Sequence, residues 1–403
     1  MTSSPIDSRP PPGAASASLK ARFSSAIELA EAQLDRTCAL WPPERPAPVH
    51  TVEGAWFRPH DLWTDWTPGF LAGQLWILAK LTGKPAWRER AEAYTIKLAP
   101  RRFDRDVHDL GFIFLSSYGR WIDALAPDDP LRPQLEDIVV TAATVQSYRW
   151  NANGPEGFIY SFNGPQSLFV DVMMNVRLLF WGARRGAPSE VARRAIEHCR
   201  TSARYLVRRD GKGLGDVSGS VAHEAIFNTE PGRGELRCLS TQQGYSPFTC
   251  WARGLAWAIY GFAEAFRYSG DPELLETAER CAEFYLRNTP AGLVPYWDYG
   301  APGIPNEPLD SSAAAIAGCG FDLLARLAPA ERAERYRSAC TEIASTLTSD
   351  SFLARPGGKE EGILLHAVYH RPKAWGVDAS VPWGDYFYLE LLERLWDGAR
   401  AWV

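Results

Sequence analysis

The segment Ser311-Ser-Ala-Ala-Ala-Ile-Ala-Gly-Cys-Gly-Phe-Asp-Leu-Leu-Ala-Arg-Leu327 is apolar on nearly every side when it is wound as a helix. A helix without a polar face must be buried among other elements, because it has no side to give to water. The next helical segment, Glu331–Ser349, follows after only Ala328-Pro329 and carries charges at helical spacing. We therefore expect a fold built from pairs of helices, one buried and one half-exposed.

The same pairing recurs along the chain. Further segments that are apolar nearly all round are Gly69–Leu81, Leu110–Ile122, Leu168–Ala183, Phe248–Phe266 and Val381–Leu395. Further amphipathic segments are Leu19–Cys38, Ala86–Leu98, Leu131–Tyr148, Ser189–Arg209 and Pro272–Asn288. Six segments of each kind predict an inner ring of helices inside an outer ring, which is an all-α (α/α)6 barrel.

The connections between the helices alternate in length. Each inner helix leads to the next outer helix through a short turn that contains Pro, such as Thr82-Gly-Lys-Pro85. The connections in the other direction are long, at about 39–66, 99–108, 149–167, 210–247, 289–310 and 350–380. Long loops in a compact domain are usually functional. We expect the active site on the rim where these loops meet the N-termini of the inner helices, with short strands such as Gly157–Phe162.

Composition excludes several classes of protein. The 403 residues are 46% hydrophobic and 23% charged, as in an ordinary globular protein. A formal net charge of −5 argues against nucleic acid as a partner, and no run of roughly 18 apolar residues predicts a membrane span. The segment Met1–Ser18 is rich in Ser, Pro and Ala, so we expect a disordered tail before one catalytic domain at 19–403.

The cysteines and glycines fit no cofactor motif. The seven Cys form no CxxC pair, and the glycines form neither a GxGxxG nor a Walker pattern. We expect free, mostly buried thiols in a cytoplasmic protein, and neither a metal nor a cofactor. The sequence leaves the oligomeric state open.

Two aspartates are the candidate catalytic groups. Asp171 lies in the apolar string Leu168-Phe-Val-Asp-Val-Met-Met-Asn175, and burial there is expected to raise its pKa, as a proton donor needs. Asp109 lies where a long loop enters an inner helix. Paired carboxylates are what acid–base chemistry on a glycoside requires. A helix N-cap for Asp109, and packing or an N-terminal hydrogen bond for Asp171, stay open as alternatives.

Four further residues are candidates for binding. Arg253, in an apolar helix, needs an anion, which is either an internal carboxylate or a ligand. Trp257 lies one turn on and could stack on a sugar or belong to the core. Gln243 in the preceding loop could assist in binding a carboxylate, and His223 lies in the longest loop, where a lone His is more often a surface residue. Asp310 is most simply an N-cap.

Several strings together resemble the unsaturated glucuronyl hydrolases, glycoside hydrolase family 88. The resemblance runs from about residue 20 to the C-terminus. It rests on Trp66-Thr-Pro-Gly-Phe70, His108-Asp-Leu-Gly-Phe112, Asp171-Val-Met-Met-Asn175, Thr241-Gln-Gln-Gly-Tyr-Ser246, Trp251-Ala-Arg-Gly254 with Ala256-Trp257, Pro295-Tyr-Trp-Asp298, Ile304-Pro-Asn-Glu-Pro308 with Asp310-Ser-Ser-Ala-Ala-Ala315, and Gly376-Val-Asp378 with Trp383-Gly-Asp-Tyr386. That family has an (α/α)6 barrel.

The resemblance implies hydrolysis of an unsaturated oligosaccharide made by a lyase. Such an enzyme protonates C4 of the terminal uronic acid, adds water at C5, and lets the hemiketal open. It implies that Asp171 is the general acid/base and that Asp109 is the second essential aspartate. It further implies that the uronate carboxylate is bound by Gln243 and Arg253, that other pocket residues are Trp66, His108, His223 and Trp257, and that Phe162 and Ser380 are looser matches.

The chain also departs from the family pattern. Members often have His at the position of Gln242, an acidic pair at Pro247-Phe248 and Trp at the position of Phe162. These differences bear on which second sugar is accepted. Three alternatives remain: an unsaturated rhamnogalacturonyl hydrolase on pectin fragments, an ordinary inverting glycosidase, and a sugar-binding protein without activity.

Overall fold

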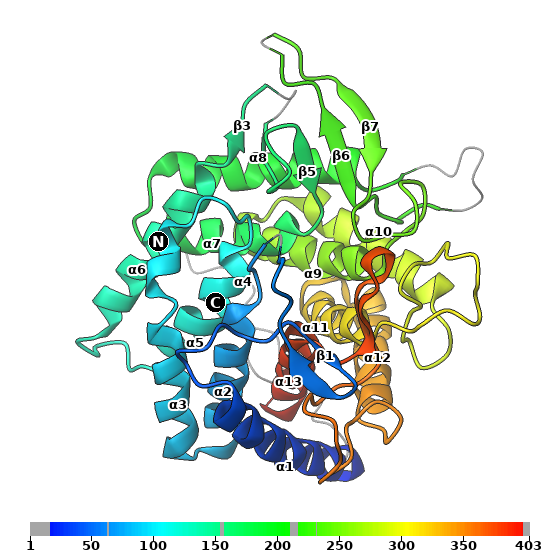
Figure 1. Cartoon of the computed structure of the whole chain (residues 1–403). Helices are drawn as coiled ribbons and strands as arrows, with labels where there is room; N and C mark the ends of the chain where they lie inside the picture. Colours follow the sequence, from blue (N-terminus) through cyan, green and yellow to red (C-terminus); the bar gives the residue numbers. More distant parts are fainter. Residues whose placement is uncertain (1–16, 63, 154–156, 210–216, 231, 398–403) are drawn as a thin grey trace.

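The computed structural model describes residues 17–62, 64–153, 157–209, 217–230 and 232–397 (Figure 1). Most of the predicted tail, Met1–Ser18, lies outside the described residues. Ala17 and Ser18 already belong to helix α1 (Ala17–Leu40), so the helical domain begins two residues earlier than predicted. Within the described ranges, each helix is too short or too polar to cross a membrane.

The inner ring is closed. It consists of α2 (Pro68–Thr82), the continuous run α4 (Leu110–Phe114), η3 (Leu115–Gly119) and α5 (Arg120–Asp123), then α7 (Val172–Ala183), α9 (Ala252–Ser269), α11 (Ser311–Leu327) and α13 (Pro382–Asp397). Consecutive members pack against one another, and α13 packs against α2. Every residue of α11 from Ser311 to Ala325 is buried, as expected for a helix without a polar face.

The outer ring surrounds it (Figure 1). Its members are α1, α3 (Pro85–Ile96), α6 (Arg132–Ser147), α8 (Ser189–Tyr205), α10 (Pro272–Asn288) and α12 (Ala330–Leu347), with the short helix η2 (Ala99–Phe103) after α3. Each outer helix packs on an inner one, for example α3 on α2, α10 on α9 and α12 on α11. The predicted (α/α)6 barrel is confirmed.

Short antiparallel strands occupy the long loops. The pairs are β1 (His50–Val52) with β2 (Ala55–Phe57), β3 (Trp150–Asn151) with β4 (Phe158–Ile159), and β8 (Ala367–His370) with β9 (Trp375–Ala379), which flank η4 (Arg371–Lys373). A three-stranded sheet has the order β5 (Ser167–Phe169), β6 (Glu224–Phe227), β7 (Leu236–Ser240). The predicted strand at 157–162 contains β4.

These loops meet over the N-terminal ends of the inner helices. The loop 289–310 accepts a hydrogen bond at Trp297 O from Ala252 N, at the start of α9 (3.0 Å). The loop 350–380 accepts one at His366 O from Ser311 N, at the start of α11 (2.9 Å). Strand β5 leads directly into α7. The long loops therefore gather on one rim, as the loop lengths predicted.

Two inner helices begin later than the sequence predicted. Leu168 and Phe169 belong to β5, where they pair with Ala225 and Glu224 of β6, and α7 starts only at 172. Likewise, 248–251 is loop before α9. Aromatic and branched apolar side chains suit a buried strand as well as a buried helix, so periodicity could not separate the two. Asp171 therefore precedes its helix instead of lying three residues inside it.

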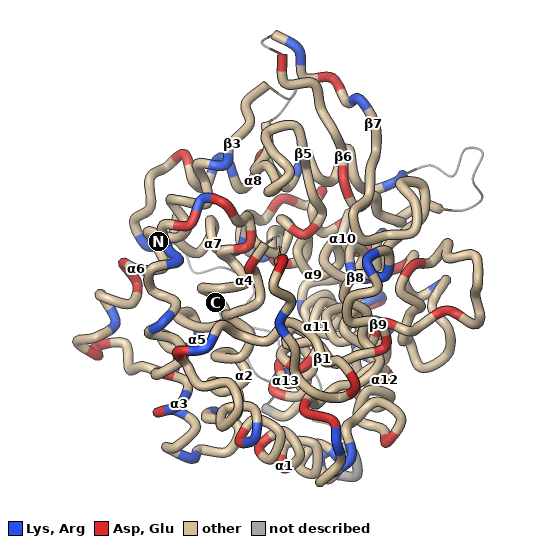
Figure 2. The backbone as a smooth tube through the Cα atoms, viewed as in Figure 1, with Lys and Arg blue, Asp and Glu red and all other residues tan. Residues whose placement is uncertain are grey.

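Charged side chains fill the other end of the inner ring. Arg120 Nη1 lies 2.8 Å from Glu393 Oε2. The guanidinium of Arg394 contacts Glu390 Oε1 (2.8 Å) and Asp322 Oδ2 (3.2 Å). All five side chains are buried. Elsewhere, Lys and Arg are scattered among Asp and Glu along the chain (Figure 2).

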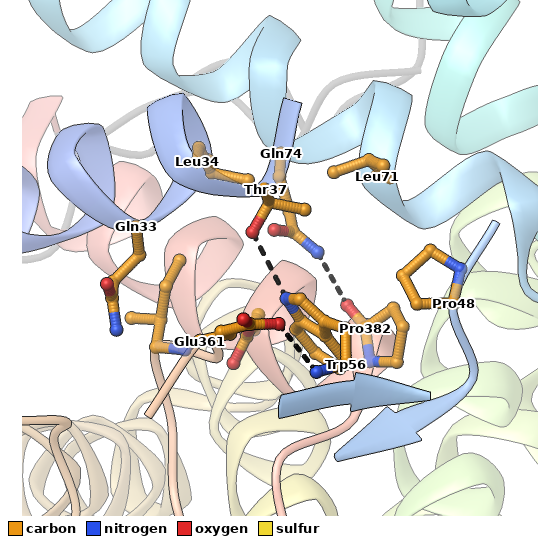
Figure 3. Close-up of a pocket in the computed structure, with 11 residues that line it drawn as sticks. Gln33, Leu34, Thr37, Pro48, Trp56, Leu71, Gln74, Glu361 and Pro382 are labelled. Atoms are coloured by element: carbon orange, nitrogen blue, oxygen red, sulfur yellow. Dashed lines mark hydrogen bonds between the residues drawn. The ribbon is translucent and has the colours of Figure 1, made fainter. Parts of the chain in front are cut away.

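A small cavity lies where α1 joins the barrel (Figure 3). Its volume is about 10 Å³, which is room for a single water molecule. Trp56 in β2 donates from its backbone N to Glu361 Oε2 (2.7 Å) and from its ring Nε1 to Thr37 Oγ1 on α1 (3.1 Å). Gln74 on α2 donates to Pro382 O at the start of α13 (2.8 Å). Buried polar contacts thus join the β1–β2 hairpin to α1 and to the loop that carries Glu361, and join α2 to α13.

Candidate active site

Asp109 and Asp171 each occupy the N-cap position of an inner helix, α4 and α7. An N-cap Asp normally accepts a hydrogen bond from a backbone N–H of the first turn. Neither side chain makes that bond. Asp310, before α11, does make it, accepting from the N–H groups of Ser312 (3.1 Å) and Ala313 (3.3 Å) as predicted. The carboxylates of Asp109 and Asp171 are therefore free of the capping role that the sequence left open.

A histidine with a fixed tautomer faces Asp171. His223 Nδ1 accepts from the backbone N–H groups of Gln242 (3.1 Å) and Gln243 (3.3 Å). An Nδ1 that accepts leaves the ring proton on Nε2. That Nε2 lies 3.4 Å from Asp171 Oδ2. The side chain of His223 is buried, so the alternative of a surface residue does not hold.

Asp109 also lies opposite a histidine whose other ring nitrogen accepts a backbone hydrogen bond. His108 Nδ1 accepts from the backbone N–H of Phe162 (3.1 Å), and its Nε2 lies 3.4 Å from Asp109 Oδ2. Burial lowers the pKa of His108 to about 3, so the ring is neutral at physiological pH. The half-buried Phe162 stacks on it, with ring centroids 5.1 Å apart and planes 10° from parallel. Each carboxylate thus meets one imidazole N–H.

The two carboxylates have opposite pKa shifts. Burial and the neighbouring charge of Asp171 raise the pKa of Asp109 well above its usual value. Burial would also raise the pKa of Asp171, but the neighbouring imidazoles of His223 and His108 and the charge of Arg253 outweigh it and lower this pKa. The expected raised pKa at Asp171 was therefore wrong. The sequence showed the apolar neighbours of Asp171 in the chain, but not the polar groups that the fold brings to it.

Arg253 has an internal anion. Its Nη1 lies 3.3 Å from Asp310 Oδ2 and also donates to Val368 O. Its Nη2 donates to Gln243 Oε1 (2.5 Å) and to Tyr369 O (2.8 Å). Since Asp310 neutralises this buried guanidinium, the need of Arg253 for an anion is no evidence of a substrate carboxylate.

The contact with Arg253 orients the amide of Gln243. With Oε1 fixed on the guanidinium, the Nε2 group is the part of Gln243 left for other partners. None of the described residues accepts a hydrogen bond from it. The site therefore presents an amide donor at this position, backed by a buried cation.

The remaining predicted site residues differ in their burial and in their contacts. Trp257 is fully buried, with its ring centroid 4.9 Å from that of Phe112, so of the two alternatives that the sequence left open this geometry favours the core. Trp66 is 8% exposed and packs on Trp383, with ring centroids 4.6 Å apart. Ser380 is bound through its backbone to Thr51 of β1, and no contact of its hydroxyl with the other site residues is found in the described part of the chain.

Glu224 was missed by the sequence reasoning. Its buried carboxylate accepts from Ser167 Oγ (2.5 Å), Asn163 Nδ2 (3.0 Å) and Gln242 Nε2 (3.3 Å). It thereby connects the loop that carries Phe162 with the loop that carries Gln243. The signal in the sequence that could have revealed Glu224 is a single charged residue at the start of an otherwise apolar strand.

Chemically, this arrangement can donate and accept a proton. The pKa values of two buried carboxyl groups are shifted in opposite directions, and imidazole and amide groups surround them, which is the division of roles found in glycosidases. None of the described residues forms a cluster of His, Cys, Asp and Glu suited to a metal ion. Fold and site together define a glycoside hydrolase on an (α/α)6 barrel.

Comparison with known proteins gives the family. No protein-family model matches the chain. The unsaturated glucuronyl hydrolase of Bacillus sp. strain GL1 is 35% identical over 354 residues, which cover 84% of this chain and 88% of that protein. Its crystal structure superposes with a TM-score of 0.82 over 93% of this chain and 97% of that one. The unsaturated chondroitin disaccharide hydrolase of Streptococcus pyogenes serotype M1 is 30% identical, covering 83% of this chain and 82% of that protein. The chain belongs to the unsaturated glucuronyl hydrolase family.

Proposed function

We propose that this enzyme removes a terminal Δ4,5-unsaturated uronic acid from lyase-generated oligosaccharides by hydrating its C4=C5 double bond. The observation that supports this best is the pair Asp109 and Asp171, two carboxyl groups of opposite pKa shift that each face one imidazole N–H. The chemistry needs one group that gives a proton to C4 and then accepts one from water.

Asp171 is the group to which we assign this double role. The surroundings raise the pKa of Asp109 and lower the pKa of Asp171. A bound uronate adds a negative charge, which raises the pKa of Asp171 and allows it to take up a proton. Asp171 then delivers that proton to C4, and positive charge develops at C5 and the ring oxygen. Water adds at C5 while its proton goes to Asp171, so the acid is regenerated and the hemiketal opens to release the second sugar.

The substrate carboxylate is expected at Gln243. Its Nε2 group is a donor oriented by Arg253, so the anion is bound by a neutral amide with a cation behind it. We propose that Trp66, His108, Phe162 and His223 form the rest of the binding surface. We further propose that Ser380 lies near the second sugar. The buried Trp257 acts by supporting the core beneath the site.

The second sugar is left to experiment. The relative in Streptococcus pyogenes is named for chondroitin disaccharides, so glycosaminoglycan fragments are the first substrates to test. All seven cysteines are free, and five of them are buried, which supports our proposal of a reducing, cytoplasmic location.

The test is a panel of unsaturated disaccharides that includes glycosaminoglycan, gellan-type, xanthan-type and rhamnogalacturonan fragments. Hydration removes the conjugated double bond, so turnover is followed as loss of its ultraviolet absorbance. In heavy water the product should carry deuterium at C4. Turnover of saturated aryl glycosides with none of the unsaturated disaccharides would instead establish an ordinary glycosidase. Turnover of rhamnogalacturonan fragments alone would establish the pectin-directed alternative.

A further inference from the structure

Asn175 connects the two carboxylate-bearing segments. It lies one turn into α7 and is fully buried. Its Oδ1 accepts from the backbone N–H of Phe112 in the first turn of α4 (2.9 Å). Its Nδ2 donates to Asp109 Oδ1 (3.0 Å) and to the backbone O of Asp171 (3.2 Å). One amide group therefore touches both segments from which the catalytic carboxylates project.

The bond to Phe112 is the one that an N-cap side chain would normally make. In most helices a side-chain oxygen of the N-cap residue accepts from the second or third N–H of the helix. At α4 the N-cap residue is Asp109, and it does not do so. Asn175, from a different helix, accepts from this N–H instead. Asp109 is thereby released from capping without leaving a buried N–H unsatisfied.

A glycine makes this contact possible. A Cβ at Gly111 would lie 2.7 Å from Cα and 2.8 Å from Oδ1 of Asn175. Real Cβ atoms do not approach other atoms so closely, so any other residue at this position would push α4 away from α7. The contact between α4 and α7 therefore depends on Gly at 111 and on Asn at 175.

From this geometry we infer that Asn175 is a positioning residue, which caps α4 in place of Asp109 and orients the Asp109 carboxyl toward Asp171. The inference rests on the proposed function, since it assigns a role to Asn175 in the same site. Its effect on the reaction passes through Asp109, and Asn175 itself is not a catalytic residue.

The amide also affects the proton of Asp109. A donor to a carboxylate favours the ionised form, so the Asn175 bond lowers the pKa of Asp109 and partly offsets burial. The other charged or titratable groups that act on Asp109 are Asp171, Arg149 and Arg101, and the neutral His108 faces it. Removing the donor should therefore raise the pKa of Asp109 further, while these other groups stay in place.

The decisive variant is Asn175→Asp, which keeps the shape and the acceptor for Phe112 but replaces the donor with a carboxyl oxygen. We expect kcat to fall about tenfold or more with KM changed less than about threefold, because an interaction with a catalytic group is lost but the sugar contacts remain. The pH–rate limb that reports Asp109 should move to higher pH. Asn175→Ala, which also uncaps α4, should lose more activity and some thermal stability.

The matched control is Gln74→Met. Gln74 is also a buried amide on an inner helix, and it too links two helices through a backbone oxygen. This variant should lower the melting temperature and leave kcat and the pH profile unchanged. If Asn175→Asp also kept the wild-type kcat and pH profile, or lost activity only in proportion to its folded fraction, the inference would be overturned.

A second measurement separates this inference from the proposed function. Titration of the Asp109 carboxyl by carbon-13 NMR needs no turnover. A higher Asp109 pKa in Asn175→Ala, which removes the donor without adding a charge, than in the wild type supports the positioning role even if none of the disaccharides is a substrate. An unchanged Asp109 pKa contradicts it even if the wild type turns over a disaccharide.

Discussion

His223 presents its Nε2–H to Asp171 Oδ2 at 3.4 Å because two backbone N–H groups, of Gln242 and Gln243, occupy its Nδ1. The protein thus fixes the tautomer with main-chain atoms and leaves the imidazole proton for the carboxylate. This distance is longer than a strong hydrogen bond, and such contacts commonly tighten when substrate binds. These surroundings lower the pKa of Asp171, and a negative charge added beside it would raise that pKa.

Replacing His223 should change the pH dependence of the reaction. The His223 ring is a main cause of the lowered pKa of Asp171, so His223→Gln should raise that pKa. Activity that falls as pH rises through the pKa of the acid should then persist to higher pH, although the maximal kcat is lower. The matched control is His198→Gln, because His198 is also buried with Nδ1 on a backbone N–H, that of Ile159. A pH–rate profile of His223→Gln that superposes on the wild type would contradict the pairing.

Removing the proton carrier should nearly abolish turnover. Asp171→Asn keeps the shape but cannot exchange a proton, so kcat should fall by roughly 10²–10⁴-fold while substrate still binds. Asp109→Asn should also be impaired, through altered orientation and electrostatics beside Asp171. Asp271→Asn is the control, because Asp271 caps the outer helix α10, Asn caps equally well, and the weakened pair with the exposed Arg200 should cost less than about 1 kcal/mol of stability. Near-normal kcat in Asp171→Asn would make Asp109 the first candidate for the acid.

The barrel could be predicted because its signal is local. An apolar helix such as 311–327 must be buried wherever it lies, and a Pro-containing turn marks its partner. The rim that carries the site could be predicted from the lengths of the loops alone. The start of α7 could not be predicted, because pairing of Leu168 with Ala225 is a contact between residues far apart in sequence.

The site was predictable in its residue types but not in their partners. Both aspartates and both histidines were found from motifs. Three properties depended on tertiary contacts: Asp310 neutralises Arg253, Trp257 is enclosed by the core, and the pKa values of Asp109 and Asp171 shift in opposite directions. The residues next to these positions in the sequence carry no information about such tertiary contacts. The short string Asp171–Asn175 contains Asn175, which links the two carboxylates. Gly111, against which Asn175 packs, lies on another helix.

Arg253 and Gln243 should behave as one unit. If Arg253 acts by orienting the Gln243 amide, Arg253→Ala should lower kcat/KM at least about tenfold, and Gln243→Ala should do nearly the same. The double variant should then be little worse than either single one, since the two residues share one interaction. Arg253→Lys should rescue poorly because an ammonium cannot reproduce the planar fork. Additive losses in kcat/KM would instead mean that each residue binds the substrate independently.

Arg394 tests whether the charged end of the ring is structural. Its guanidinium pairs with Glu390 and Asp322 and is 1% exposed, so Arg394→Met removes a buried cation that two buried carboxylates share. Glu390 then keeps the cation of Arg120 at 3.6 Å, and Asp322 keeps that of Arg326 at 3.0 Å. We expect a loss of about 3–5 kcal/mol in the free energy of unfolding, measured by urea denaturation, with kcat per folded molecule unchanged. Arg193→Met is the control, because its pair with Glu197 is solvent-exposed and should contribute less than about 1 kcal/mol. Equal stability losses in the two variants would show that the buried charges at this end contribute no more than surface ones.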